Sequence, residues 1–145
     1  MNAMKLPRTT RLTGAAVAAL MVTAGAVAVA SPAAAKTHNV VIDKVALGST
    51  NQSVETDVTY TCDKGSDLDL KVTVRGPGRV FGLPAMGTAT IPNKDLTCDY
   101  QPHALHLKLI SHTGGTFKKG DLVGVTAGYP LKNGDFLGEQ KSFFL

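Results

Sequence analysis

Apolar and polar residues alternate with a period of two along most of this sequence. The alternation is clearest in residues 54–62, 68–74 and 105–109. Successive side chains of a β-strand point to opposite faces, so this pattern predicts strands with one buried and one exposed face. Between residues 36 and 145, no stretch of about a dozen residues carries an apolar stripe of helical period without glycine or proline. The sequence therefore predicts an all-β domain.

Turn-forming residues divide this part of the chain into short segments. The predicted strands are residues 38–47, 53–62, 68–75, 79–90, 94–100, 103–111, 121–129 and 135–145. Asn133-Gly134 is the strongest hairpin signal, because both central residues of a type I′ turn need a positive φ. Seven or eight short strands predict an immunoglobulin-like antiparallel β-sandwich, with a closed barrel as the alternative. The chain has no tryptophan, so this likeness to immunoglobulins concerns the architecture only.

The first 35 residues differ in composition from the rest and hold 12 of the chain's alanines. They divide into a basic segment, an uncharged apolar segment and a short run of small residues, which are Met1–Leu12, Thr13–Ala30 and Ser31–Ala35. This layout predicts that residues 1–35 are a signal peptide cleaved after Ala35, with a second possible site after Ala30. The weak hydrophobicity of alanine and glycine argues against a membrane anchor. We expect a secreted, extracellular domain of residues 36–145 that is free of the membrane after cleavage.

The net charge of the chain, +4, comes mostly from this leader. Without residues 1–35, 12 basic and 11 acidic residues remain. This near-neutral balance lacks the excess positive charge that is typical of nucleic-acid-binding domains. The remaining length of about 110 residues is typical of a domain with one hydrophobic core. We therefore expect a single-domain monomer with no nucleic-acid partner.

Cys62 and Cys98 are the only cysteines, and an exported chain meets an oxidising compartment. Their even number predicts one intramolecular disulfide, which for a loop of this length contributes roughly 4 kcal/mol in the chain-entropy model. Cys62 is in phase with Val58 and Tyr60, so we expect it on an inward face, where the bond would join the two sheets. A copper or zinc thiolate is the alternative, but neither cysteine has a histidine or a second cysteine within three residues.

Four segments carry a family resemblance: Thr59–Asp63, Leu68–Val74, Leu96–Asp99 and Pro102-His103. Together they resemble small secreted immunoglobulin-like proteins of actinobacteria, over about residues 54–130. The resemblance implies a β-sandwich, a Cys62–Cys98 bond and export, and it carries no catalytic residue over. Two other groups of secreted actinobacterial sandwiches, the enediyne-carrying apoproteins and the subtilisin inhibitors, usually have two disulfides and fit less well.

The histidines and carboxylates give no catalytic or metal-binding pattern. The histidines are His38, His103, His106 and His112, and we expect them in loops or on exposed strand faces. Asp63, Asp67 and Asp69 surround Gly65 without the spacing of an EF-hand, so solvated turn carboxylates are preferred over a calcium loop.

The remaining candidates for chemistry are also explained by strand structure. Glu55 and Asp57 share an exposed strand face, where pairing with Lys71 or Arg75 on a neighbouring strand accounts for them. No serine lies in a nucleophile elbow, and the adjacent Ser111 and His112 would point to opposite faces of a strand. We therefore expect no enzyme activity, no metal and no cofactor.

Residues 76–86 are the least regular stretch, being apolar and interrupted by glycine and proline. An edge strand blunted by Pro84 is one interpretation. The other is a binding surface that presents Arg79, Phe81 and Met86, since arginine and aromatic side chains anchor interfaces. The sequence favours a secreted, non-catalytic binding or interaction module for an extracellular protein or glycan. A small-molecule or metal carrier is the alternative, and a secreted enzyme inhibitor fits less well.

Overall fold

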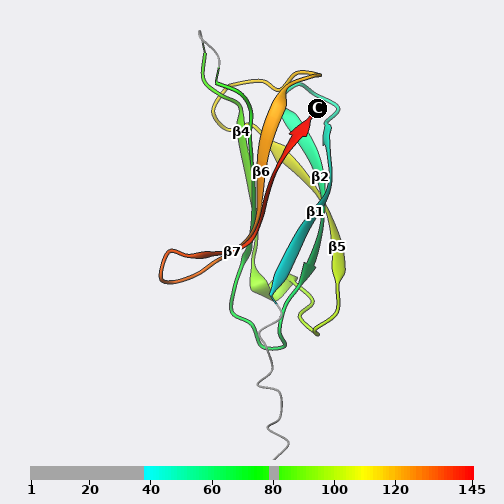
Figure 1. Ribbon diagram of the computed structural model, residues 1–145, viewed down its shortest axis with the longest axis vertical. Helices are drawn as coiled ribbons and strands as arrows, with labels where there is room; N and C mark the ends of the chain where they lie inside the picture. The colour runs from blue at the N-terminus through cyan, green and yellow to red at the C-terminus, as the bar shows by residue number, and fades with distance from the viewer. Residues whose placement is uncertain (1–37, 79–81) are drawn as a thin grey trace, which may run out of the picture. The chain divides into compact units, whose positions relative to one another are not determined.

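The domain is a two-layered antiparallel β-sandwich (Figure 1). The computed structural model describes residues 38–78 and 82–145. Its strands are β1 (Asn39–Leu47), β2 (Ser53–Thr61), β3 (Leu70–Arg75), β4 (Met86–Ile91), β5 (His103–Ile110), β6 (Leu122–Pro130) and β7 (Phe136–Phe144). One sheet has the order β1-β2-β5 and the other β4-β3-β6-β7. The predicted sandwich is confirmed, with seven strands in the described part of the chain.

The order of the strands differs in one place from that of an immunoglobulin constant domain. In that domain the fourth strand extends the sheet of the first, second and fifth strands. Here β4 pairs with β3 from Leu70↔Ile91 to Arg75↔Met86 and so belongs to the opposite sheet. The chain therefore changes sheets between β4 and β5.

The period-two alternation correctly predicts the faces of the central strands. The fully or almost fully buried side chains of these strands are Val54, Val58 and Tyr60 of β2, Leu70, Val72 and Val74 of β3, and Val123, Val125, Ala127 and Tyr129 of β6. They face one another across the two sheets and form one core. Burying each large apolar side chain stabilises the fold by about 1.5–3 kcal/mol. The β5 pattern is weaker, because Leu109 is buried whereas Leu105 and Leu107 are only half-buried.

Two predicted strands need correction. Residues 94–100 form no strand: a 3₁₀ turn, η3 (Asn93–Asp95), is followed by irregular chain up to β5. This segment crosses from one sheet to the other, so it has no ladder to join. The strand predicted over residues 79–90 begins only at Met86, since the described residues 82–85 before it are irregular.

The Cys62–Cys98 disulfide is present, but it does not link two strands. Cys62 directly follows β2 and is fully buried, whereas Cys98 lies in the crossover between β4 and β5. Backbone contacts accompany the bond, because the Tyr100 N–H donates to the Cys62 carbonyl at 3.1 Å. The Thr97 N–H donates to the Tyr60 hydroxyl oxygen at 3.0 Å. The disulfide therefore fixes the crossover to the end of one sheet, and the expected strand-to-strand link between sheets is wrong.

The strand directions give the sandwich two ends with different loops. We call one the His38 end, which carries the 62–69 loop, the 92–102 crossover and the 131–135 hairpin turn. We call the other the Met86 end, which carries the 48–52 turn, the 111–121 connection, the described residues between β3 and β4, and Leu145. β3 runs from Leu70 at the first end to Arg75 at the second.

The β6–β7 hairpin extends away from the sandwich at the His38 end (Figure 1). Gly128 and Gly138 lie opposite each other in the ladder, and a Cβ on Gly138 would clash with the Ala127 carbonyl oxygen. At the tip, Gly134 has a φ of 88°, but Asn133 is not among the described residues with positive φ. The hairpin is where the sequence predicts it, but the turn is not type I′.

Candidate functional site

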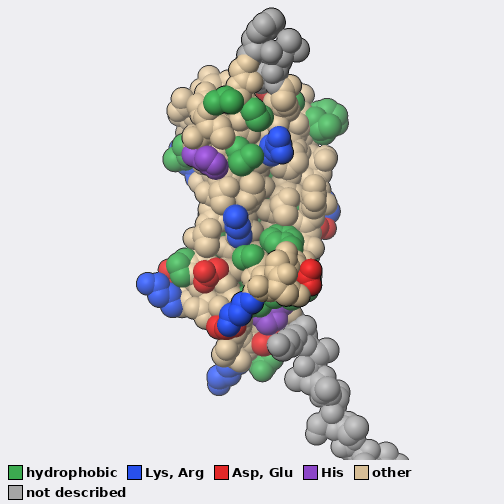
Figure 2. Space-filling model, turned by 90° about the vertical axis from the view of Figure 1, so that its left-hand side faces the viewer, with side chains coloured by type: hydrophobic (Ala, Val, Ile, Leu, Met, Phe, Trp, Pro, Cys, Tyr) green, Lys and Arg blue, Asp and Glu red, His purple; other side chains and the backbone are tan. Residues whose placement is uncertain are grey.

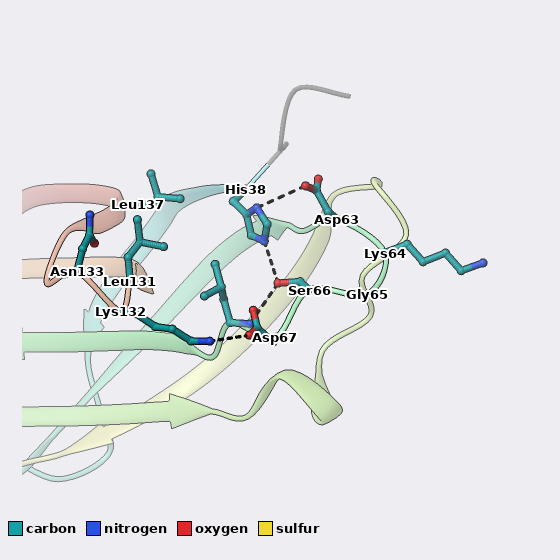
Figure 3. Close-up of a pocket in the computed structure, with 11 residues that line it drawn as sticks. His38, Asp63, Lys64, Gly65, Ser66, Asp67, Leu131, Lys132, Asn133 and Leu137 are labelled. Carbon is teal, nitrogen blue, oxygen red and sulfur yellow. Dashed lines mark hydrogen bonds and ion pairs between the residues drawn. The ribbon is translucent and has the colours of Figure 1, made fainter. Parts of the chain in front are cut away.

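The His38 end holds a cavity of about 570 Å³ between the 62–69 loop and the β6–β7 hairpin (Figure 3). Leu68, Leu131 and Leu137 supply its apolar lining. The other lining residues are His38, Asp63, Lys64, Gly65, Ser66, Asp67, Lys132 and Asn133. We call this cavity the His38 pocket. It brings together side chains that lie in three separate parts of the sequence.

His38 is held at the wall of this pocket by contacts on both sides of its ring. Nε2 lies 2.9 Å from the Ser66 hydroxyl oxygen, within hydrogen-bond distance. Nδ1 lies 3.8 Å from Oδ2 of Asp63 and has no hydrogen-bond partner. The side chain is only 5% exposed. The ring thus has one satisfied nitrogen and one buried nitrogen that lacks a hydrogen bond, which is an uncommon state for a buried polar atom.

The buried Tyr129 ring packs against the His38 ring. The two rings meet edge to face, with their centroids 5.1 Å apart. The Tyr129 hydroxyl donates to the Thr61 carbonyl at 3.1 Å, and burial raises the pKa of this hydroxyl. Since Tyr129 belongs to β6 and Thr61 to β2, this contact joins the two sheets beside the pocket.

The 62–69 loop presents Ser66 in a fixed position. The Ser66 N–H donates to the Asp63 carbonyl at 3.0 Å, and the Leu68 N–H donates to the Ser66 hydroxyl oxygen at 3.2 Å. The Asn93 side-chain amide donates to the Ser66 carbonyl at 2.6 Å. These three hydrogen bonds fix the Ser66 hydroxyl in position in the absence of a ligand, which lowers the entropic cost of binding.

The carboxylates of this loop have separate partners. Asp67 pairs with Lys132 of the hairpin turn at 3.4 Å, with both side chains well exposed. Asp69 accepts the Asn93 N–H at 2.9 Å. Within residues 38–78 and 82–145, no three His, Cys, Asp or Glu side chains form a group that could hold a metal ion.

Two other histidines behave as the sequence predicts, and one does not. His103 pairs with Asp99 at 2.7 Å and His106 with Asp57 at 2.6 Å, on exposed surfaces. The hydrogen bond from His103 lowers the pKa of Asp99. His38 contradicts the prediction of exposed histidines, because the fold covers its side chain at the His38 pocket.

The predicted pairing of Glu55 and Asp57 with β3 is also wrong. In the ladder Glu55 lies opposite Lys108, and Asp57 lies opposite Lys44 and His106. The reason is topological, since β2 lies between β1 and β5, whereas β3 lies in the other sheet.

The structure describes only part of the predicted binding surface at residues 76–86. Arg79 and Phe81 lie outside the described residues. Met86 is half-buried and lines a second hollow, of about 440 Å³, on the four-stranded sheet. Its neighbours there include Arg75, Leu122 and Gln140. Figure 2 shows scattered hydrophobic side chains in the upper half of this side of the molecule, whereas acidic ones gather lower down.

The main residues that sequence reasoning missed are His38 and Ser66. They are 28 positions apart and meet only because β1 and the 62–69 loop lie together at one end of the sandwich. No local motif signals this contact. In the described part of the chain, no helix is long and apolar enough to cross a membrane. No family model, no curated protein and no solved structure matches this chain.

Proposed function

We propose that this protein is exported, loses residues 1–35 and acts outside the cell as a non-catalytic binding module. Its site is the His38 pocket, and its ligand is a small molecule with an apolar part and a polar group. The leader composition and the disulfide support the export. The pocket supports the binding role.

The observation that carries the proposal is the make-up of the pocket. A volume of about 570 Å³ falls in the usual range for small-molecule sites. Such sites combine an apolar lining with a few fixed polar groups. Here Leu68, Leu131 and Leu137 give the lining, and the Ser66 hydroxyl and Lys132 ammonium lie beside it.

Native mass spectrometry of the protein secreted into culture medium tests this proposal. We expect a bound small molecule that is lost in Leu137→Asp, because a carboxylate would replace the apolar wall. Leu83→Asp is the matched control, since Leu83 is 65% exposed and lies at the Met86 end. Equal ligand occupancy in both variants, or an empty wild-type protein at every growth condition tried, would contradict the proposal.

The second surface for a binding role is the hollow around Met86. It fits a protein or glycan partner better than a small molecule, because it lies on an open sheet face lined by Arg75, Gln140 and Ser142. Substituting Arg79, Phe81 and Met86 together by alanine should abolish capture of such a partner from culture supernatant. If capture persists in this variant but fails in Leu137→Asp, the macromolecular partner uses the His38 pocket.

A second candidate function is acyl-group hydrolysis. The His38 ring lies between the Ser66 hydroxyl and the Asp63 carboxylate, as the base of a catalytic triad lies between its serine nucleophile and its carboxylate. Ser66 and His38 are within hydrogen-bond distance, but the 3.8 Å between His38 Nδ1 and Asp63 Oδ2 leaves the ring without its orienting bond. The Ser66 oxygen also accepts the Leu68 N–H. Turnover of activated esters that disappears in Ser66→Ala would favour this function over binding alone.

A further inference from the structure

We propose that the outer face of the four-stranded sheet binds an anionic polysaccharide whose sugars carry carboxylates, with Arg75 and Lys71 as the charged contacts. The site consists of the hollow around Met86 and the adjoining part of this face. The inference rests on the proposed binding role outside the cell and gives the second surface named above a ligand class. It does not depend on the His38 pocket.

The strands of this sheet are almost free of acidic residues. Glu139 is the only aspartate or glutamate in β3, β4, β6 and β7. It lies opposite the buried Ala127 and so belongs to the inner side of the sheet. Its Oε2 accepts the Ile42 N–H at 2.7 Å, and its Oε1 lies 2.7 Å from the Lys141 ammonium. The outer face of these four strands therefore carries no carboxylate.

Two basic side chains lie on the same outer face. β3 alternates between fully buried and more exposed positions, and Lys71 and Arg75 are both at exposed ones. In the described part of the chain, the ion pairs involve other groups, so neither cation has a carboxylate partner there. A guanidinium can donate two parallel hydrogen bonds to one carboxylate. The charge of this face is therefore complementary to an anionic ligand.

The three-stranded sheet differs in this respect. Asp43 lies in β1, and Glu55 and Asp57 lie in β2. Asp57 lies 2.6 Å from His106, and Glu55 lies opposite Lys108 in the ladder. Acidic and basic side chains on these strands thus compensate each other, so the uncompensated positive charge belongs to the four-stranded sheet.

A glycine makes the middle of the four-stranded face hollow. Gly124 lies between Arg75 of β3 and Ser142 of β7, and a Cβ on it would meet nothing within 4 Å. The polar side chains around this hollow of about 440 Å³ also include Thr73, Thr126 and Gln140. Hydroxyl and amide groups both donate and accept hydrogen bonds, as the hydroxyls of a sugar require.

Apolar side chains border the hollow toward the Met86 end. Leu122 lines it, and Phe144 lies opposite Leu122 in the ladder; both are exposed. Sugar rings carry C–H groups that lose contact with water favourably against such side chains. Positive charge, hydroxyl groups and an apolar border on one face fit a carboxylated sugar better than an acidic peptide.

The spacing of the two cations favours a polymer over a single sugar. Lys71 and Arg75 are four residues apart in β3, which is about 13 Å because a strand rises about 3.3 Å per residue. One chain of sugars can place a carboxylate at each cation, and the second contact then forms within the complex. We therefore expect an oligosaccharide to bind more tightly than its monomer.

Isothermal titration calorimetry of the full chain, exported and purified from culture medium, tests the inference. The probes are oligogalacturonate and oligomannuronate, two chains of carboxylated sugars that differ in linkage, and the methyl ester of the first, which keeps the sugars and lacks the charge. We expect at least one acidic chain to bind, more weakly as salt is added, and the ester and galacturonate monomer to bind poorly. Equal binding of the acid and its ester, or no binding of either acidic chain, would overturn the inference.

Variants locate the binding on this face. Arg75→Gln should weaken it by about 10-fold and Lys71→Gln by about 3-fold, because the guanidinium forms the stronger charged hydrogen bonds. Gly124→Val keeps both charges, fills the hollow and should weaken binding as much as Arg75→Gln. Lys108→Gln makes the same change of charge on the other sheet and should bind like the wild type. Equal losses in Lys108→Gln and Arg75→Gln, or full binding by Gly124→Val, would show attraction by net charge alone and refute the site.

Two other polyanions separate carboxylated sugars from other ligands. Polyglutamate carries carboxylates without sugars, and dextran sulfate carries sugars without carboxylates. If either binds as tightly as the acidic oligosaccharide, the assignment to carboxylated sugars is wrong. These outcomes are distinguishable from failure of the His38 pocket, because Leu137→Asp should lose the small molecule and keep the oligosaccharide, whereas Arg75→Gln should do the reverse.

Discussion

The two ends of the sandwich are stabilised in different ways. At the His38 end, the Cys62–Cys98 bond and short hydrogen bonds hold the crossover and the 62–69 loop. At the Met86 end, two backbone hydrogen bonds of Leu145 hold the 111–121 connection. The Leu145 N–H donates to the Asp121 carbonyl, and the Gly120 N–H donates to the Leu145 carbonyl. Irregular chain surrounds the His38 pocket, whereas β-strands dominate the hollow near Met86. The disulfide therefore lies at the end of the sandwich where irregular segments, and not strands, have to be held in place.

Deleting Phe143–Leu145 should have the largest effect and should unfold the domain. Phe143 and Leu145 pack against the core, and the deletion removes both hydrogen bonds of Leu145. Circular dichroism of the truncated protein should show no cooperative thermal transition. Phe144→Ala is the control, because Phe144 is 75% exposed and its substitution should change stability little. A truncated protein with the wild-type melting temperature would refute the importance of the terminus.

Replacing both cysteines by alanine should cost roughly 4 kcal/mol of the free energy of unfolding. The sequence separation of 36 makes the closed loop long, and its release raises the entropy of the unfolded chain. Urea denaturation of the double variant measures the loss. The rate of amide hydrogen exchange should increase first in the 92–102 crossover. An equal increase in exchange rate at both ends would show that the disulfide does not stabilise the His38 end in particular.

Gly138→Ala should destabilise the protein by about 1–3 kcal/mol, because the added methyl group meets backbone atoms that cannot move independently. Gly124→Ala is the matched control. Gly124 lies in β6 toward the Met86 end, and a Cβ there meets nothing within 4 Å. Thermal unfolding of both variants tests whether the hairpin glycines shape the His38 end. Equal melting temperatures would show that they do not.

Acid should have the smallest effect, and it should act first toward the His38 end. The His103 hydrogen bond lowers the pKa of Asp99, and the Ile42 N–H lowers the pKa of Glu139. A depressed carboxyl pKa contributes stability above the ordinary values of 3.8 and 4.5, and this contribution is lost as the pH falls through the folded-state pKa. Denaturant titrations at pH 7 and pH 3 should therefore show a smaller difference for Asp99→Asn and Glu139→Gln. If the loss of stability between pH 7 and pH 3 is the same in these variants as in the wild type, Asp99 and Glu139 do not contribute to it.

The alternation of Val54, Val58 and Tyr60 was sufficient to predict an inward face, because the strand period is local information. The same reasoning failed for residues 94–100, where apolar Leu96 is packed by a turn and not by a strand. A sheet crossover depends on which strands become neighbours, and no local period encodes that choice. The partners of Glu55 and Asp57 were missed for the same reason.

The sequence by itself determined the strand-rich domain, its inward faces, the pair of cysteines and the position of the hairpin. Each of these follows from side-chain periodicity, residue type or turn chemistry within a few positions. Only the tertiary structure placed β4 beside β3 and brought His38 to Ser66 across 28 residues. Such contacts depend on the packing of two sheets, which no short segment of the chain specifies.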